Sequence, residues 1–345
     1  MAMASEERPP GLRLLASHRD PHAAALRLAD TAFLEPRFDT ATEAGMAASL
    51  EWCLDVCERH AVDVYAVQGR QRLLAPHADA FAAIGTRLLL PAAAEVLDTL
   101  DDKTRFHAAA LSAGLPMPWT REVRDAEAFD AAREALASRG LPACVKPPRG
   151  IFGAGYWRLV DELSPFDALM RPDDRRMPSS VLRAALDAMP GASGARRLLV
   201  LEFLRGPEWS VDCLCDGGRT LAAVARLKLG RVQRLAAEGP AIELARRTVE
   251  TFGLSGLINV QLRAGGDGAE EDLRILEVNA RMSGGCLYTR ASGVNLPWWH
   301  VALAVGARSP EDVPRARGGA LVASATVARE IDAGPGHAAP PDAAG

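Results

Sequence analysis

The segment around Glu277 carries the residue types in this sequence that are best suited to chemistry. Glu277, Asn279 and Arg281 alternate along a strand-like stretch, and Gln261 lies in the strand-like run before it. Alternate side chains of an extended strand project from one face, so a carboxylate, an amide and a guanidinium are expected to point the same way. Carboxylate and amide oxygens suit Mg²⁺, and arginine suits phosphate or carboxylate. A solvent-facing polar strand is the alternative.

A lysine followed by a glycine-rich loop occurs upstream. Lys146 ends a strand-like run, and the loop after it contains Arg149, Gly150, Gly153 and Gly155. Glycines let backbone N–H groups approach phosphate oxygens. The loop is not a Walker A motif, because no Gly-Lys-Ser/Thr ends it, and a strand-like segment follows it where a Rossmann fingerprint needs a helix. The pattern favours a glycine-rich hairpin over phosphates, with a plain hairpin turn as the alternative.

Further charged residues stand where they could complete a nucleotide site. Lys103 lies near the start of a predicted helix, and Glu202 and Glu208 flank a strand-to-turn junction. Carboxylates bind ribose hydroxyls well, and the backbone of such a segment can read adenine. Arg226 and Lys228 alternate on a later strand and would offer positive charge to a γ-phosphate. The alternative for these lysines and for Arg226 is an exposed surface position.

The elements that must position these residues begin with an alternation of strands and helices. Over about the first 98 residues, short strand-like runs are predicted at 12–16, 31–34, 62–67 and 87–90, with helices at about 42–60 and 70–83. This alternation predicts a parallel sheet with ligands beyond the carboxyl ends of its strands. His18-Arg19 and Gln68-Gly69-Arg70 follow two of the strands and could touch substrate, although surface loops would look the same.

The remaining elements change in character. We expect one helix over about 100–117, an α+β segment over about 118–200 that includes a helix at 126–139, and long strands at 198–204 and 209–228. The long strands suggest an antiparallel sheet, and a helix at about 238–252 leads to the strands of Gln261 and Glu277. The Pro-, Ala- and Gly-rich residues 333–345 are expected to be disordered.

Composition limits the classes of function. The 345 residues carry 40 Lys and Arg against 44 Asp and Glu, a formal net charge of −4, which recommends neither nucleic acid nor a membrane surface as a partner. No apolar stretch approaches the ~20 residues of a membrane span, and Glu6 and Glu7 lie where a signal peptide would be apolar. We therefore expect a cytoplasmic protein. The six cysteines lack a second Cys or His pair that would complete a zinc site, and we expect them to be buried.

Taken in order, these motifs resemble the ATP-grasp superfamily of carboxylate–amine or carboxylate–thiol ligases. The resemblance is greatest to the branch that contains carbamoyl phosphate synthetase and biotin carboxylase, and it covers roughly residues 60–305. Its motifs are Asp102-Lys103, Val145-Lys146-Pro147 with the glycine loop, Glu202-Phe203-Leu204 with Glu208, Gln261, and Glu277-x-Asn279-x-Arg281. The fold class implied is α/β and α+β: an N-terminal parallel α/β domain (1–98) before a two-subdomain ATP-grasp domain (99–306) with a lid at about 118–200, then a C-terminal strand or extension (307–332).

The resemblance also implies roles for individual residues. ATP would be contacted by Lys103, Lys146, Arg149, Gly150, Gly153, Gly155, Glu202, Phe203, Leu204 and Glu208, with the loop over the triphosphate, Glu202–Leu204 at the adenine and Glu208 at the ribose. Gln261, Glu277 and Asn279 match positions that bind Mg²⁺ (or Mn²⁺). Arg281 would steady the phosphate and an acyl-phosphate, and we add Arg226 and Lys228 to it as catalytic residues.

The resemblance implies an ADP-forming ligase that activates a small-molecule carboxylate for attack by an amine or another nucleophile. Gln261 stands where many relatives have a second carboxylate. A single ATP-grasp unit argues against a complete carbamoyl phosphate synthetase, and the short C-terminus argues against biotin carboxylase. A non-catalytic ATP-binding regulator is the alternative function, and a homodimer is the assembly that we consider. The sequence determines neither the carboxylate nor the nucleophile.

Overall fold

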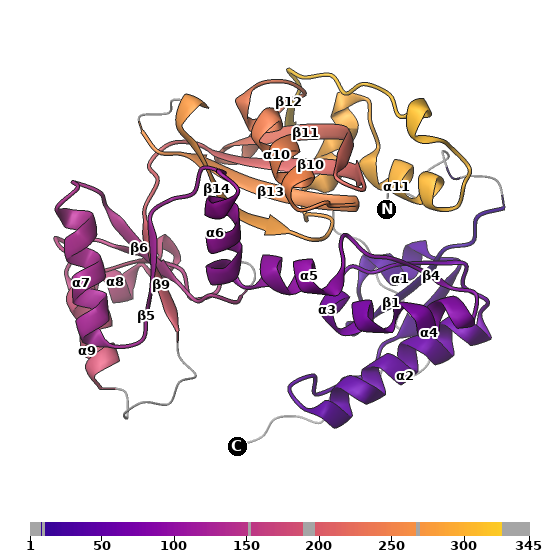
Figure 1. Ribbon diagram of the computed structural model, residues 1–345, viewed down its shortest axis with the longest axis horizontal. Coiled ribbons are helices and arrows are strands. Elements are labelled where there is room, and N and C mark those ends of the chain that lie inside the picture. Colours follow the sequence, from indigo (N-terminus) through magenta and orange to yellow (C-terminus); the bar gives the residue numbers. More distant parts are fainter. Residues whose placement is uncertain (1–7, 9–10, 151–152, 189–196, 267–269, 326–345) are drawn as a thin grey trace.

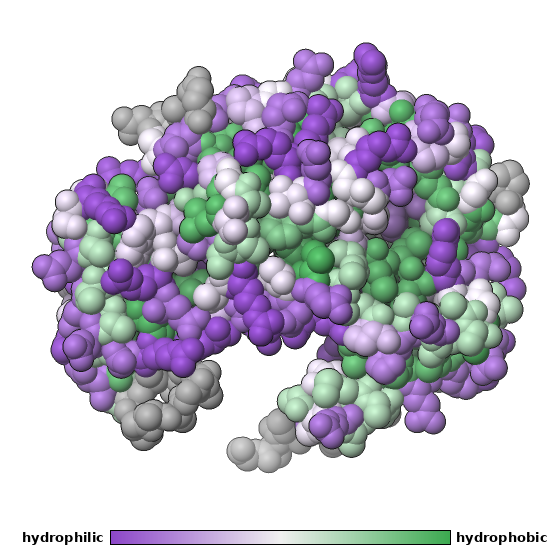
Figure 2. Space-filling view, viewed as in Figure 1, coloured by the Kyte–Doolittle hydropathy of each residue, from purple (hydrophilic) through white to green (hydrophobic). Residues whose placement is uncertain are grey.

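The computed structural model describes residues 8, 11–150, 153–188, 197–266 and 270–325, and the expected disordered tail at 333–345 lies outside them. Three parts are visible in Figure 1: an N-terminal part at the lower right, a lid at the left, and a large sheet along the top. Figure 2 shows a wide notch between the lid and the N-terminal part, with hydrophilic side chains along its upper edge.

The N-terminal part contains two pairs of parallel strands. The strands are β1 (Leu15–His18) with β2 (Thr31–Leu34) and β3 (Val64–Ala66) with β4 (Arg87–Leu89). The helices are α1 (Ala24–Leu28), α2 (Glu43–Arg59), α3 (Gln71–Leu74) and α4 (Ala78–Ala83). Buried Cys53 and Cys57 on α2 pack with Leu74 and Phe81, which accounts for two of the six cysteines as core residues. The predicted parallel α/β arrangement is thus present, but as two separate strand pairs, and the helix predicted at about 70–83 is divided into α3 and α4.

The connecting segment contains two helices where the sequence predicts one over about 100–117. Helix α5 (Ala94–Asp101) ends before Asp102, whose extended backbone (φ −100°, ψ 105°) opens helix α6 (Lys103–Ser112). The Asp102 carboxylate accepts hydrogen bonds from Thr104 N (3.1 Å) and Arg105 N (3.4 Å), as an N-cap does. The predicted helix corresponds to α6, which begins at Lys103 and ends at Ser112, and α5 was not predicted. Lys103 consequently occupies the first position of α6.

The lid is a five-stranded sheet with helices on one face. Its strand order is β5-β9-β6-β7-β8, and every pair except β7 with β8 is antiparallel. The strands are β5 (Thr120–Val123), β6 (Ala143–Lys146), β7 (Trp157–Leu159), β8 (Arg176–Met177) and β9 (Leu198–Glu202), and the helices are α7 (Ala126–Ala137), α8 (Pro165–Met170) and α9 (Ser179–Asp187). Phe129 and Leu136 of α7 pack on Val145 and Val200, so alternate strand residues are left to face the other way.

The large sheet has six antiparallel strands in the order β14-β13-β10-β11-β12-β15. Its strands are β10 (Glu208–Asp216), β11 (Arg219–Leu229), β12 (Val232–Ala236), β13 (Gly256–Ala264), β14 (Leu273–Asn279) and β15 (Leu321–Ala323). Helices α10 (Pro240–Thr251) and α6 cover one face, where Val211, Ala225 and Val260 form a core with Ile242 and Ala245. Helix α11 (Leu296–Ala304) packs near the far end of the opposite face.

Alternation along the strands makes the second face of this sheet polar. Register places Arg226 opposite Ser210, Ser210 opposite Gln261, and Gln261 opposite Glu277, in one row across four strands. Cross-strand partners share a face, so the row turns away from the apolar core. All six cysteines are buried free thiols, as expected. No helix in the described part of the chain is long and apolar enough to span a membrane.

Candidate functional site

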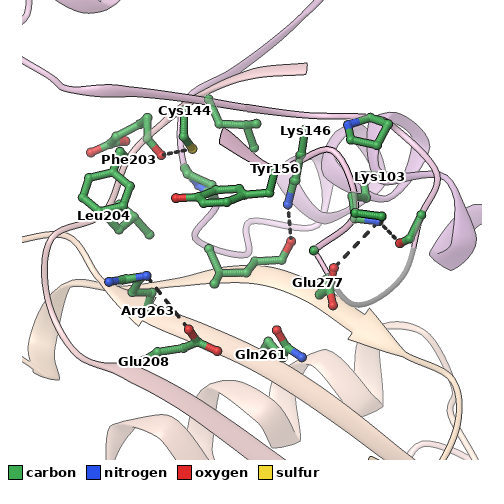
Figure 3. Close-up of a pocket in the computed structure, with 18 residues that line it drawn as sticks. Lys103, Cys144, Lys146, Tyr156, Phe203, Leu204, Glu208, Gln261, Arg263 and Glu277 are labelled. Atoms are coloured by element: carbon green, nitrogen blue, oxygen red, sulfur yellow. Dashed lines mark hydrogen bonds and ion pairs between the residues drawn. The ribbon is translucent and has the colours of Figure 1, made fainter. Parts of the chain in front are cut away.

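A cavity lies between the lid sheet and the polar face of the large sheet (Figure 3). Ten predicted site residues line it: Lys103, Lys146, Gly150, Gly153, Glu202, Phe203, Leu204, Glu208, Gln261 and Glu277. They come from helix α6, from three strands of the large sheet, and from two strands of the lid with the loops that follow them. The sequence reasoning missed other lining residues, namely Cys144, Tyr156 and Arg263. Arg263 could have been found, because it alternates with Gln261 along β13 and must share its face.

Two lysines converge on one carboxylate in this cavity. The Lys103 ammonium lies 3.8 Å from the Glu277 carboxylate and donates a hydrogen bond to Gly150 O (3.0 Å). The Lys146 ammonium donates to the carbonyl of Leu276 (3.4 Å). Burial lowers the pKa of Lys146, the Glu277 charge partly raises it, and the Lys103 charge lowers it further. Because two cations face one anion, the site has a positive surplus that phosphate oxygens would neutralise.

The predicted metal ligands meet at the edge of the same cavity. Gln261 pairs with Glu277 across β13 and β14, and Asn279 Nδ2 donates to Glu277 Oε1 (3.2 Å). Arg281 Nη2 lies 3.5 Å from Asn279 Oδ1, so the guanidinium adjoins this trio. No three His, Cys, Asp or Glu side chains gather as a metal site anywhere in the described ranges. One carboxylate with two amide oxygens nevertheless fits a Mg²⁺ ion, which commonly takes few protein ligands and completes its shell with phosphate and water oxygens.

The carboxylate predicted to bind ribose is held between two cations. Lys228 Nζ forms an ion pair with Glu208 Oε1, and Arg263 Nη1 lies 3.9 Å from Glu208 Oε2. Arg263 Nε also donates to the carbonyl of Gly206 (3.0 Å), which fixes its guanidinium beside the cavity. The side chain of Lys228 therefore reaches Glu208, and Lys228 is absent from the described lining of the cavity. Its contact with a γ-phosphate stays a prediction.

The segment predicted to read adenine closes one end of the cavity. The Phe203 ring lies under two guanidinium groups, with the Arg158 Cζ 4.4 Å and the Arg263 Cζ 5.2 Å from its centroid. Glu202 Oε2 accepts a hydrogen bond from Trp119 N (3.2 Å), and Leu204 is buried. The segment is thus anchored on both sides, and Glu202, Phe203 and Leu204 all line the cavity.

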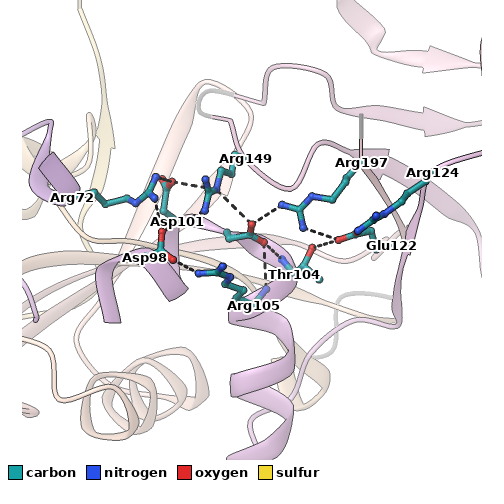
Figure 4. Close-up of polar contacts among 10 residues, drawn as sticks. Arg72, Asp98, Asp101, Thr104, Arg105, Glu122, Arg124, Arg149 and Arg197 are labelled. Atoms are coloured by element: carbon teal, nitrogen blue, oxygen red, sulfur yellow. Dashed lines mark hydrogen bonds and ion pairs between the residues drawn. The ribbon is translucent and has the colours of Figure 1, made fainter. Parts of the chain in front are cut away.

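Arg149 takes a different direction from the rest of the glycine loop. Its guanidinium lies 3.3 Å from Asp98, 3.8 Å from Asp101 and 3.5 Å from Asp102, in the charged cluster of Figure 4. Aspartates around the α5–α6 junction thus bind this side chain, and its contact with the triphosphate stays a prediction. Gly155 does not line the cavity either. It has φ +72°, and an added Cβ would lie 2.9 Å from Pro147 Cδ, so the loop requires glycine there for its shape.

Arg226 is also directed away from the cavity. Its side chain is 3% exposed, and its Nε donates to the Asp212 carboxylate (2.7 Å). Asp212 on the neighbouring strand binds Arg226 in this structure, and the contact of Arg226 with a γ-phosphate stays a prediction. The signal for Asp212 was present in the sequence: Glu208, Ser210 and Asp212 alternate along one strand and share a face with Arg226.

The N-terminal loops predicted to touch substrate make mostly internal contacts. Arg70 and Arg19 both pair with Glu35, and Arg70 has a left-handed backbone (φ 62°). Its neighbour Gln71 donates to the carbonyl of Ala280 (3.2 Å), between Asn279 and Arg281. The N-terminal part is therefore attached next to the predicted metal ligands, although His18, Arg19 and Arg70 do not line the described cavity.

The comparisons with known proteins agree with this geometry. Residues 195–328 match a family described as "ATP-grasp in the biosynthetic pathway with Ter operon". No curated protein sequence matches the chain. A solved ADP complex of N5-carboxyaminoimidazole ribonucleotide synthetase is similar in structure, with TM-score 0.61, 16% identity, and coverage of 92% of this chain and 75% of that one.

Two further structures place the same fold in other enzymes. The biotin carboxylase domain of Hydrogenobacter thermophilus 2-oxoglutarate carboxylase, solved with MgADP, ADP and bicarbonate, has TM-score 0.61 and 19% identity over 90% of this chain and 68% of that one. L-amino acid ligase from Bacillus licheniformis has TM-score 0.55 and 15% identity over 83% and 66%. The resemblance to the ATP-grasp superfamily and the predicted fold class are confirmed: this chain has an N-terminal α/β part followed by an ATP-grasp fold.

Proposed function

We propose that this ATP-grasp chain is an ATP- and Mg²⁺-dependent ligase. It activates a small-molecule carboxylate as an acyl-phosphate, with release of ADP, and an amine or another nucleophile then displaces phosphate. The observation that carries the proposal is the convergence of Lys103 and Lys146 on Glu277 inside a cavity between two sheets. The names of the similar structures support it, because they include a synthetase with ADP, a carboxylase domain with MgADP and a ligase.

Each group of site residues has its own role in this reaction. Lys103 and Lys146 bind phosphate oxygens, and the segment Glu202–Leu204 with Glu208 holds adenine and ribose. Gln261, Glu277 and Asn279 would hold Mg²⁺, or Mn²⁺ in its place, which would supply positive charge to the phosphates. Arg281, next to Asn279, orients the substrate carboxylate and the acyl-phosphate. Positioning and electrostatics therefore account for most of the rate enhancement.

The lid has the task of excluding water. An acyl-phosphate that is exposed to solvent hydrolyses, so the cavity must close during turnover. The hydrogen bond from Lys103 to Gly150 O already links helix α6 to the glycine loop of the lid. We propose that the loop Arg149–Gly155 closes further over the triphosphate when ATP binds, which would require Arg149 to leave its aspartates.

The setting of the reaction is part of the same proposal. We propose a cytoplasmic enzyme, acting alone or as a homodimer on small molecules, with neither nucleic acid nor a membrane as partner. A net charge of −4 supports the absence of both partners. The alternative function is an ATP-binding regulator without turnover. The intact set of Gln261, Glu277 and Asn279 favours the enzyme, since a site that only held adenine would not need metal ligands.

A single assay separates the two functions. Mixtures of carboxylates and amines are screened for stimulated ADP release from MgATP, and MgATP binding is measured by calorimetry in parallel. Stimulation that the Glu277→Gln variant loses supports the ligase. Binding of MgATP without stimulation by any mixture favours the regulator, and a protein that fails to bind MgATP contradicts both.

A further inference from the structure

A buried ion pair lies beside the predicted metal ligands and has no role in the proposed mechanism. We call it, with the serines that bind it, the Arg226 cluster; its members are Arg226, Asp212, Ser210 and Ser283. Arg226 Nε donates to Asp212 Oδ2 (2.7 Å), and Arg226 Nη2 donates to Ser210 Oγ (2.9 Å) and Ser283 Oγ (2.9 Å). Arg226 Nη1 donates to Gln233 Oε1 (2.7 Å), so both terminal nitrogens and Nε have acceptors.

The aspartate of the cluster is equally well satisfied. Asp212 Oδ1 accepts a hydrogen bond from Ser283 Oγ (2.6 Å) and another from Asn259 Nδ2 (3.0 Å). The side chains of Arg226 and Asp212 are 3% and 2% exposed. A buried ion pair of this kind is weak evidence for stability, because apolar residues of similar volume often serve as well. The position of the ion pair beside the predicted metal ligands points to a functional role.

The cluster lies in the same cross-strand rows as the metal ligands. Ser210 is the cross-strand partner of both Arg226 and Gln261, and Gln261 is the partner of Glu277. In the next row Asn259 lies between Asp212 and Asn279. Ser210 therefore lies between Gln261 and Arg226, and Asn259 lies between Asn279 and Asp212.

The cluster also supports the turn that follows Arg281. Ser283 belongs to this turn and bonds to both charged partners. Gly285 closes the turn against the Arg226 guanidinium so tightly that an added Cβ would lie 2.3 Å from Nη1 and 2.8 Å from Cζ. Arg281 lies between Asn279 on strand β14 and this turn. Its backbone N donates to Asn279 O (2.8 Å), and its Nη1 donates to Met282 O (3.1 Å).

We propose that Arg226 and Asp212 are a positioning pair that sets the turn 282–285, and through it the place of Arg281 relative to the γ-phosphate. Neither residue touches the nucleotide. The inference rests on the proposed function, since Arg281 is taken to orient the substrate carboxylate there. An error of about 1 Å in such a group can cost on the order of 10²-fold in rate, which would account for keeping a buried ion pair beside the site.

The test compares Ser283→Ala, Gly285→Ala and Arg226→Lys with the wild type. Ser283→Ala removes one hydrogen bond to each partner, Gly285→Ala displaces the guanidinium, and Arg226→Lys keeps the charge but loses the forked geometry. Ser309→Ala, in a distant turn, is the matched control. We measure the dissociation constant for MgATP by calorimetry, and kcat and the KM for the carboxylate in ADP release.

If Arg226 and Asp212 are a positioning pair, these substitutions should change turnover but not the affinity for MgATP. The MgATP dissociation constant stays within about threefold of the wild type in every variant, while kcat falls at least tenfold in Gly285→Ala and Arg226→Lys and the KM for the carboxylate rises. Ser283→Ala, which preserves the ion pair and the fold, shows the same pattern in weaker form. Normal turnover in Ser283→Ala and Gly285→Ala overturns the inference. So does a weakened MgATP affinity in Arg226→Lys, which would indicate direct phosphate contact. A wild type that neither binds MgATP nor releases ADP overturns the proposed function as well.

Discussion

The ammonium of Lys103 lies 3.8 Å from the carboxylate of Glu277, although one residue opens helix α6 and the other lies near the end of strand β14. In Figure 3 the side chains of Lys103 and Lys146 both point toward this carboxylate. Glu277 therefore serves two purposes in the proposed site: it compensates two lysines before ATP binds, and it supplies the single charged ligand for the metal ion. Loss of this one carboxylate should affect both.

Replacement of Glu277 with Gln or Ala should lower kcat for ADP release on the order of 10²-fold or more, because charge on the transferring phosphoryl group would lose its metal compensation. Initial rates at saturating MgATP provide the measurement. Glu243→Gln is the matched control, since Glu243 lies on the far side of the sheet in helix α10 and pairs only with exposed Arg246 among the recorded ion pairs. Near-normal turnover in Glu277→Ala would refute the metal assignment.

Binding of MgATP should weaken as the pH rises toward 10, because burial lowers the pKa of Lys146 and only its ammonium form attracts phosphate. The affinity is expected to fall up to tenfold per pH unit above the lowered pKa. Calorimetry in two buffers of different ionisation enthalpy should also show proton uptake on binding at alkaline pH. The Lys146→Arg variant keeps its charge and should show a flat profile. An equal alkaline loss in that variant would assign the titration to another group.

Much of this architecture follows from local patterns in the sequence. Alternation of polar and apolar residues identifies the strands that carry Glu208, Gln261 and Glu277 and the face on which they lie, because the period of a strand is fixed by its geometry. The glycines after Lys146 likewise identify the loop that bounds the cavity. These features depend on neighbours in the chain, so a single sequence contains them.

Pairings between side chains that are distant in the sequence could not be predicted in this way. Arg149 and Arg226 each have the right type and spacing to bind phosphate, yet each pairs with aspartates from other elements: Asp98 and Asp101 of α5 in the first case, Asp212 in the second. Which carboxylate is near an arginine depends on strand register and on the break at Asp102, and neither is visible locally. Register also places Arg263 directly opposite Glu208, where it lines the cavity.

Neutralising Asp98 and Asp101 together as Asn should lower the KM for ATP, because it removes two aspartate partners of Arg149, with Asp102 left as a third, and so favours closure over the triphosphate. The pairs to Asp98 and Asp101 are partly exposed, so together they contribute about 1 kcal/mol, which corresponds to a change of about fivefold. Arg149→Met should raise the KM. Asp130→Asn, which removes a partner of Arg183 in the lid, is the control. An unchanged KM in both the aspartate and the arginine variants would exclude Arg149 from nucleotide binding.

The Lys228→Met variant should raise the KM for ATP about two- to fivefold and leave kcat nearly unchanged. Lys228 forms an ion pair with Glu208, the carboxylate proposed for ribose, and an ion pair of this exposure is worth about 0.5–1 kcal/mol. Arg263 would continue to hold Glu208 from the other side. Steady-state kinetics with Arg219→Met, at the far end of the same strand, as control would check this. A large loss in kcat would instead restore the predicted contact between Lys228 and the γ-phosphate.

The free energy of unfolding should decrease as the pH falls from about 6.5 to about 4, and His300 should account for part of the decrease. Burial lowers the pKa of His300 to about 4, and the ring packs so closely on Gly256 that an added Cβ there would lie 2.9 Å from its Cε1. The unfolded chain binds the proton first, at a pKa near 6.5, so stability is full above that value and is lost on the way down to the folded-state pKa. The contribution is on the order of 2–3 kcal/mol. Urea unfolding from pH 4 to 8 gives the free energy of unfolding as a function of pH. Its slope should be shallower for His300→Gln than for the wild type or for His22→Gln, an exposed control. Parallel slopes would rule out a buried neutral His300.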